Sequence, residues 1–296
     1  MSNGPIAYAG EPGAFAEDAV LAAFGDAERV GVGGFREVFE AVEEGRAGAG
    51  VVPIENLVNG SVREVYDLLL EHDLSIVAEV VVPVDLCLAA LPGTTIDRVE
   101  RVYSHIQALG QAERFLRDRS WTLLTTYNTA GAGKLIALNA EAGAAAVLSR
   151  RAALAFGLKV LADGIQDVPD NRTRFLVVAQ PSAVEAAPSP IRRLHADAGP
   201  QGWRTTLAFG VRNEPGTLLA ALRAFADRAI NLSKLESRPS RTAAWEYVFW
   251  VDLDARQADP DCRDAIEALR AVASMVRSFG SYPRAADPPS RETATR

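Results

Sequence analysis

Short apolar runs alternate with stretches of helical periodicity along the first 180 residues. A short apolar run bounded by polar or turn residues is typical of a buried strand, and apolar residues that recur every three or four positions predict one face of a helix. Phe15, Ala19, Val20 and Ala23 form such a face. The pattern predicts strands at 6–8, 48–53, 75–84, 101–103, 123–126, 144–149 and 175–178, and helices at 14–24, 62–71, 106–117 and 130–139. Strands that alternate with helices predict α/β layers around a mostly parallel sheet.

The C-terminal part has a different order of elements. The pattern predicts strands at 205–211, 231–237, 245–253 and 275–280, and helices at 215–228 and 259–273. This βαββαβ order is typical of a ferredoxin-like domain.

The two parts are separated by residues 183–202, which are rich in Pro, Ala, Ser and Gly and lack periodicity, as a linker does. We therefore expect one domain over 1–182, a linker over 183–202, a second domain over 203–284, and a fraying polar tail over 285–296.

Three short patterns predict helix starts. Ser61 with Glu64, and Ser104 with Gln107, match the capping box, in which both side chains hydrogen-bond free backbone N–H groups. Pro215 is expected at the first position of its helix, where a missing N–H costs nothing.

Charge and composition exclude several functions. The formal net charge is −7 without a long basic run, which argues against a nucleic-acid partner, although a local cationic pocket could still bind an anionic substrate. No apolar stretch has the length of a membrane span, and the first residues contain no apolar run of signal-peptide length, so we expect a cytoplasmic protein without a membrane partner. Cys87, Cys262 and the three histidines have no metal-ligand spacing.

Six motifs carry a resemblance to a known family. Those in the first half are GEPGAFAE at 10–17, VPIENLVNGSV at 52–62, YSHIQALGQ at 103–111 and DNRTRF at 170–175; those in the second half are NEPGTL at 213–218 and INLSKLESRP at 230–239. The first four resemble prephenate dehydratase and the last two resemble its C-terminal ACT domain. Together they span almost the whole folded chain. The resemblance implies a two-lobed catalytic domain, similar to periplasmic binding proteins, with substrate between the lobes.

The implied reaction removes CO₂ and hydroxide from prephenate to give phenylpyruvate, with no metal and no organic cofactor. Such an enzyme must hold a dianion and assist the departure of hydroxide. The implied effector is L-phenylalanine, bound by ACT domains of a homodimer or homotetramer.

Thr173 is the expected catalytic residue, because its hydroxyl could donate to the leaving oxygen. Glu55 is expected to organise the site. Residues expected to contact substrate are Ala14, Phe15, Asn56, His105, Gln107, Asn128, Thr129, Arg174 and Phe175. Structural roles compete with several of these. Gly10 and Gly13 could form an ordinary strand-to-helix turn, Thr173 could cap a turn, and Arg174 could form a surface ion pair. His105 and Gln107 could simply cap a helix.

The implied phenylalanine site comprises two segments of the second domain. Its expected residues are Asn213, Gly216, Leu218, Asn231, Glu236, Ser237, Arg238 and Pro239. A solvated strand end is the alternative for Arg238 and Pro239.

Ala16, Leu57 and Ile106 depart from the residues common in the family. Ala16 and Leu57 remove possible polar contacts, which favours only the last of three alternatives that the sequence leaves open. These are an arogenate dehydratase, a prephenate decarboxylase, which the intact TRF sequence disfavours, and a catalytically weak amino-acid sensor.

Overall fold

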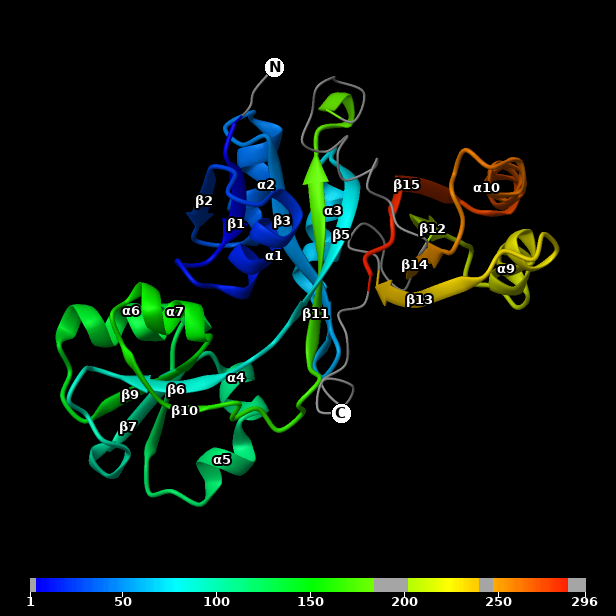
Figure 1. Cartoon of the computed structure of the whole chain (residues 1–296). Coiled ribbons are helices and arrows are strands. Elements are labelled where there is room, and N and C mark those ends of the chain that lie inside the picture. Colours follow the sequence, from blue (N-terminus) through cyan, green and yellow to red (C-terminus); the bar gives the residue numbers. More distant parts are fainter. Residues whose placement is uncertain (1–3, 184–201, 240–246, 287–296) are drawn as a thin grey trace, which may run out of the picture. The chain divides into compact units, whose positions relative to one another are not determined.

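The computed structural model describes residues 4–183, 202–239 and 247–286, which form two compact units (Figure 1). The first unit holds the residues up to His72 and Val80–Leu176; the second holds Asp73–Glu79 and the described residues from Val177 to Ala286. The division between these compact units falls inside two strands, and the expected domain boundaries stay predictions. Residues 184–201 of the expected linker and 287–296 of the expected tail lie outside the described residues.

The first lobe is built on a six-stranded sheet with the order β2-β1-β3-β11-β5, in which β4 pairs with β3. Its strands are β1 (Ile6–Ala9), β2 (Arg29–Val32), β3 (Ala49–Asn56), β4 (Gly60–Ser61), β5 (Ser75–Pro83) and β11 (Arg172–Ala179). The helices α1 (Phe15–Phe24), α2 (Phe35–Glu43) and α3 (Arg63–Glu71) pack on β1 and β3. As expected, the chain leaves this lobe after β5 and returns at β11.

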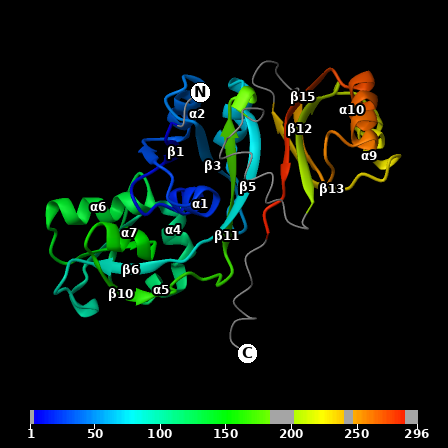
Figure 2. The same ribbon diagram turned by 45° about the horizontal axis from the view of Figure 1, so that its top comes forward.

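The second lobe is built on a five-stranded sheet with the order β10-β6-β9-β7-β8 (Figure 2). Its strands are β6 (Cys87–Ala90), β7 (Arg101–Ser104), β8 (Thr122–Thr125), β9 (Ala144–Leu148) and β10 (Lys159–Asp163). Its helices are α4 (Ile106–Gln111), α5 (Glu113–Arg117), α6 (Thr129–Asn139) and α7 (Arg150–Ala155), with a 3₁₀ turn at Ile96–Arg98. Side chains of β9 alternate between a core shared with α4 and α5 and a core shared with α6 and α7, which explains its uninterrupted apolar sequence.

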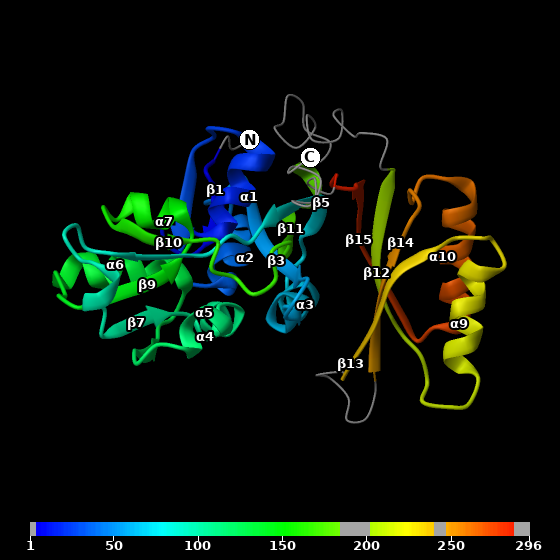
Figure 3. The same ribbon diagram turned by 60° about the horizontal axis from the view of Figure 1, so that its bottom comes forward.

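The second unit contains a four-stranded antiparallel sheet with the order β13-β14-β12-β15, comprising β12 (Trp203–Gly210), β13 (Leu232–Pro239), β14 (Tyr247–Leu253) and β15 (Met275–Pro283). Two helices, α9 (Thr217–Ala226) and α10 (Pro260–Val272), cover one face (Figure 3). Phe209, Phe225 and Leu269 lie in the core beneath them. The βαββαβ order expected from the sequence is confirmed.

Several expectations fail locally. The second-lobe sheet is mixed, because β6 pairs antiparallel with both β9 and β10. Ser61 does not cap α3, because it pairs with Glu55 in a short hairpin and Val62 becomes the N-cap. Ser104 does not cap α4; its hydroxyl donates to the carbonyl of Val147.

The expected helix over 106–117 divides into α4 and α5 at Ala112. Pro215 is not the first residue of α9, since Gly216 takes a left-handed conformation with φ of 88° and the helix begins at Thr217. The sequence patterns did not predict β2, β4, β6, β10, α2 or α7.

Candidate active site

A cavity of about 610 Å³ in the first unit is lined by residues of both lobes. Almost all the side chains expected to contact substrate line it: Ala14, Phe15, Asn56, His105, Gln107, Asn128, Thr129, Thr173 and Phe175. These residues come from segments far apart in the sequence, so the fold gathers them into one place. Their chemical roles stay predictions.

Helix N-termini form much of this lining. The first residues of α1, α2, α3 and α6 all line the cavity. The N-cap residues of α1, α2 and α3, which are Ala14, Gly34 and Val62, make no side-chain cap hydrogen bond. Backbone N–H groups without a cap, together with the positive end of the helix dipole, bind carboxylates favourably. The cavity therefore suits an anion even though few basic side chains line it.

The start of α1 differs in detail from the expectation. The N–H of Gly13 donates to Glu17 Oε2 at 2.6 Å, and the N–H of Ala14 donates to the carbonyl of Glu11 at 3.0 Å. Among the described residues, the N–H groups of Phe15 and Ala16 have no hydrogen-bond partner. These two groups, and not that of Gly13, are available to a ligand.

Thr173 is held by Asn56. Asn56 Nδ2 donates to Thr173 Oγ1 at 2.9 Å, and both residues are buried. Because Thr173 Oγ1 accepts this hydrogen bond, its own proton is free to point toward the cavity. Asn56 Oδ1 accepts from the N–H groups of Val58 and Asn59. Asn56 was expected to donate to substrate, but its amide is occupied in orienting Thr173 and the loop after β3.

Arg174 does not line the cavity. Successive side chains of a strand point to opposite faces, so Thr173 and Phe175 face the cavity and Arg174 faces away. Arg174 Nη2 lies 3.0 Å from Glu55 Oε2, and Glu55 is also absent from the lining. Arg174 and Glu55 thus pair with each other outside the cavity lining, and the expectation that Arg174 binds a substrate carboxylate stays a prediction.

The other lobe contributes His105 and Asn128. His105 is the N-cap of α4, and its Nδ1 accepts from the N–H of Gln107 at 3.4 Å. Burial lowers the pKa of His105, so the ring is neutral at pH 7 and Nε2 carries its proton. Asn128 caps α6 by accepting from the N–H of Gly131 at 2.5 Å. Both helix starts are thus fixed by side chains that also line the cavity.

Direct contacts join the two lobes beside the cavity. Ser149 Oγ donates to the carbonyl of Gly13 at 2.6 Å, and Lys134 Nζ lies 2.8 Å from Glu11 Oε1. A Cβ on Gly13 would lie 2.3 Å from Ala152 Cα, so only glycine permits this approach.

A second ion pair across the lobes lies at the start of α1. Arg151 lies 2.9 Å from Glu17. Burial raises the pKa of Glu17, but hydrogen bonds from Arg29 and Gly13 and the charge of Arg151 outweigh it and lower the pKa. Glu17 therefore stays ionised and holds both the glycine turn and the facing lobe.

Several lining residues were not expected from the sequence. They are Gly33, Gly34 and Phe35 before and in α2, Ser61, Val62, Arg63 and Glu64 at α3, and Gln111, Tyr127 and Ser149 in the second lobe. Arg63 is the only Lys or Arg among the described residues that line the cavity. The apolar periodicity of Val38, Phe39 and Val42 was the signal for α2.

The remaining features concern metals and membranes. Across residues 4–183, 202–239 and 247–286, no three His, Cys, Asp or Glu side chains gather in a way that could hold a metal ion. No helix in those ranges is long and apolar enough to cross a bilayer.

The expected phenylalanine residues lie on two segments of the second unit. Gly216 precedes α9, and a Cβ there would meet open space. Glu236, Ser237 and Arg238 lie on β13, which is the last strand of its sheet in the described chain. Asn231 Nδ2 donates to Asp254 Oδ2 at 2.7 Å, so its amide nitrogen is engaged within the domain. Asn213, Leu218 and Pro239 also lie on these two segments.

Comparison with known proteins agrees with this geometry. Residues 6–183 match the family model of prephenate dehydratase, and residues 205–271 match that of the ACT domain. The chain is 39% identical over 295 residues to arogenate dehydratase/prephenate dehydratase 2 of Arabidopsis thaliana. The matched region covers 96% of this chain and 74% of that protein. The chain is 38% identical over 284 residues to the bifunctional chorismate mutase/prephenate dehydratase of Aquifex aeolicus, with a matched region that covers 95% of this chain and 74% of that protein.

A solved structure has the same fold. Prephenate dehydratase of Arthrobacter aurescens, in complex with L-Phe, matches with a TM-score of 0.82 and 31% identity, over 96% of this chain and 92% of that one. The family model covers more than half of the chain, and the relatives extend over nearly all of it. This chain therefore belongs to the prephenate dehydratase family of lyases and carries an ACT domain in its C-terminal part.

Proposed function

We propose that this protein converts prephenate to phenylpyruvate and is inhibited by L-phenylalanine. The observation that carries the proposal is the hydrogen bond from Asn56 to Thr173 inside a cavity lined by uncapped helix starts. The helix starts can hold the two carboxylates of the substrate, and the free proton of Thr173 can meet the departing hydroxide. As the ring carboxylate leaves as CO₂, the electrons of the broken carbon–carbon bond enter the ring. They expel hydroxide from the ring carbon that lies across from the carboxylate-bearing carbon.

Thr173 acts by hydrogen bonding and not as a stored acid. An unperturbed hydroxyl does not ionise near neutral pH, so Thr173 polarises the carbon–oxygen bond and stabilises negative charge as it grows on the leaving oxygen. This contribution exists mainly in the transition state, which is why we expect it in kcat. Assembly as a homodimer or homotetramer and location in the cytoplasm belong to the same proposal.

The direct test is to incubate the purified protein with prephenate and to follow phenylpyruvate by its absorbance in alkali. A parallel reaction with arogenate, followed by formation of phenylalanine, addresses the second candidate substrate, which the name of the Arabidopsis relative includes. Turnover of neither substrate, by a folded protein, contradicts the proposal.

Arg63 gives a prediction about substrate binding. It lies at the first position of α3, and among the described lining residues it alone has a permanent positive charge. We expect Arg63→Met to raise KM for prephenate about 10-fold with little change in kcat, since a charge-assisted contact to a carboxylate contributes about 1.5–3 kcal/mol.

Arg98→Met is the matched control, because Arg98 lies in the 3₁₀ turn and does not line the cavity. Steady-state kinetics with both variants decides the point: an unchanged KM in Arg63→Met means that backbone N–H groups alone hold the carboxylates.

Regulation by phenylalanine is proposed from the ACT domain and from the L-Phe bound to the Arthrobacter relative. The strand β13 ends its sheet in the described chain, so its outer edge can pair with a second copy of the same strand. A ligand between two such domains inhibits if it binds the less active arrangement more tightly.

We expect Ser237→Leu to abolish inhibition by phenylalanine while kcat stays within about 2-fold of the wild-type value, because Ser237 is an exposed residue of β13 outside the catalytic cavity. The measurement is activity against phenylalanine concentration, with calorimetric binding of phenylalanine to the full chain. Ser274→Leu, an exposed position between α10 and β15, serves as the control. If phenylalanine inhibits Ser237→Leu as strongly as the wild type and in competition with prephenate, the effector binds in the cavity instead.

A further inference from the structure

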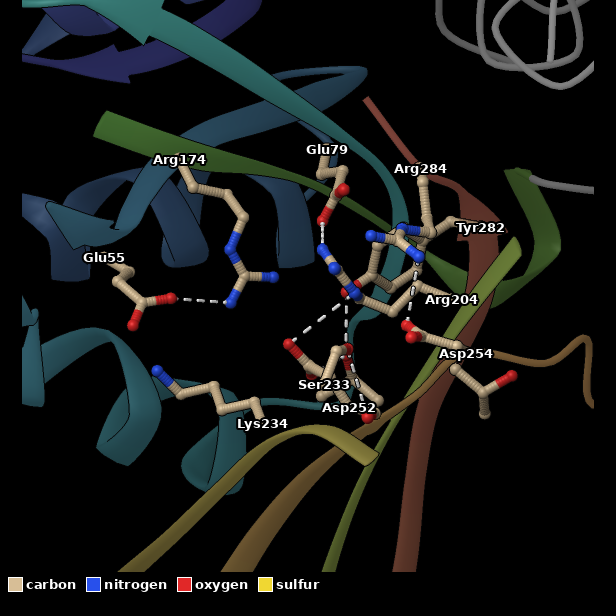
Figure 4. A network of polar contacts seen from close by, with 12 residues as sticks. Glu55, Glu79, Arg174, Arg204, Ser233, Lys234, Asp252, Asp254, Tyr282 and Arg284 are labelled. Atoms are coloured by element: carbon tan, nitrogen blue, oxygen red, sulfur yellow. Dashed lines mark hydrogen bonds and ion pairs between the residues drawn. The ribbon is translucent and has the colours of Figure 1, made fainter. Parts of the chain in front are cut away.

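A buried charge cluster joins distant segments of the second unit (Figure 4). It consists of Glu79 on β5, Arg204 on β12 and Asp252 on β14, which are 8%, 8% and 4% exposed. Arg204 Nη1 donates to Glu79 Oε2, and Arg204 Nε lies 3.8 Å from Asp252 Oδ2. One guanidinium thus lies between two carboxylates.

Further hydrogen bonds fix each carboxylate. The N–H of Ala285 donates to Glu79 Oε1 at 3.0 Å. Thr206 Oγ1 donates to Asp252 Oδ1 at 2.7 Å, so the Tyr282 hydroxyl, 2.7 Å from the same Oγ1, is the donor in that contact. Buried charges are tolerated only when they are paired and hydrogen-bonded, and removing one partner leaves the other uncompensated. The cluster therefore favours one arrangement of these strands strongly over others.

The backbones beside the cluster are also in contact. Gly280 on β15 has φ of 138°, and a Cβ there would lie 2.3 Å from the carbonyl oxygen of Ile76 on β5. Trp250 and Phe279 stack beside this contact with ring centroids 4.6 Å apart. Segment Asp73–Glu79 thus packs on the face of the ACT sheet opposite to α9 and α10.

The strand β5 continues beyond this contact. Its residues up to Glu79 belong to the second unit, and Val80–Pro83 belong to the first. Its neighbour in the sheet is β11, which carries Thr173 near its start and enters the second unit at Val177. A displacement of β12 or β14 must either separate the buried charges or move β5 with it.

We propose that the Glu79–Arg204–Asp252 cluster couples the ACT domain to the dehydratase, with Glu79 and Arg204 as positioning residues. A ligand that shifts the ACT sheet then acts on β5, and through the neighbouring strand β11 on Thr173. This inference rests on the proposed function, because it requires an effector at the ACT domain and a reaction at Thr173.

The test variant is Glu79→Gln in the full chain, since glutamine keeps the shape and an acceptor for Ala285 but removes the charge that pairs with Arg204. We expect the phenylalanine concentration for half inhibition to rise at least 10-fold, within the range of typical coupling, while kcat without effector stays within about 3-fold. Calorimetry should show a wild-type affinity for phenylalanine alone, but an affinity that no longer changes when phenylpyruvate is present, because coupling is reciprocal.

Glu267→Gln is the control, because Glu267 is an exposed carboxylate on α10 of the same unit and pairs with Arg270. Arg204→Lys keeps the charge and loses the guanidinium fork, so we expect partial coupling; it replaces Glu79→Gln if that variant does not fold. Wild-type inhibition in both variants overturns the proposal, and so does loss of phenylalanine binding or of basal turnover in a folded variant. The calorimetric coupling needs no turnover, so its failure is distinguishable from failure of the proposed reaction.

Discussion

Replacing Thr173 by alanine is expected to lower kcat for prephenate at least about 100-fold, the loss typical of one hydrogen-bond donor to charge that develops in the transition state. The hydroxyl is at the cavity, and its proton is free because Asn56 donates to its oxygen. Removing it leaves in place the helix starts that are proposed to hold the carboxylates, so we expect KM to change little. Rapid-quench or steady-state assays on the purified variant measure the effect.

Two variants make this result specific. Thr173→Ser keeps a hydroxyl and should retain most of the turnover, whereas Thr125→Ala on β8 alters a threonine outside the cavity and should have no effect. Circular dichroism and the melting temperature check that Thr173→Ala is folded. Turnover close to that of the wild type in a folded Thr173→Ala protein removes Thr173 from the mechanism.

Replacing Asn56 by aspartate is the second substitution with a large expected effect. Asn56 Nδ2 faces three oxygens, those of Asn171 at 3.0 Å, Arg172 at 3.0 Å and Thr173 at 2.9 Å. A carboxylate of the same shape donates to none of them and accepts the Thr173 proton instead. We expect kcat at about pH 7.5 to fall about 100-fold, because the proton is turned away from the leaving oxygen, and stability to fall by about 1–3 kcal/mol, because buried acceptors lose their donor.

The pH dependence separates this explanation from simple damage. Protonation of the introduced carboxyl group restores one donor, so the activity of Asn56→Asp should recover partly as the pH is lowered, whereas wild-type activity should not rise. Asn139→Asp, at the end of α6 and outside the cavity, is the matched control. Full activity of Asn56→Asp at neutral pH means that Thr173 is oriented by another group.

Local patterns in the sequence were sufficient for much of the fold. Apolar periodicity identified α1, α3 and α6 almost to the residue, and the βαββαβ order of the second domain was readable from strand and helix lengths. Ser61 does not cap α3, because it pairs with Glu55 in a hairpin. Local capping rules do not take such pairing into account. Short elements such as β10 have only partly buried side chains, so their sequence carries little periodic signal.

The residues of the candidate site were also predictable only in part. The motif residues that line the cavity were found by resemblance, whereas the role of Asn56 depends on a contact with a residue 117 positions away. No local pattern contains that contact. The orientation of Arg174 was accessible in principle, since the two-residue period of a strand sets Thr173 and Phe175 on one face and Arg174 on the other. Arg174 was expected at the substrate because of its positive charge, without regard to the face of the strand on which it lies.

The uncapped helix starts also bear on how this cavity tolerates mutation. A backbone N–H is present whatever the side chain, so the absence of a side-chain hydroxyl at Ala16 leaves the backbone donors of α1 in place. Proline, or an insertion that rotates a helix start, removes or redirects them. The position of each helix start therefore decides whether these backbone donors face the cavity, whichever non-proline side chain stands there.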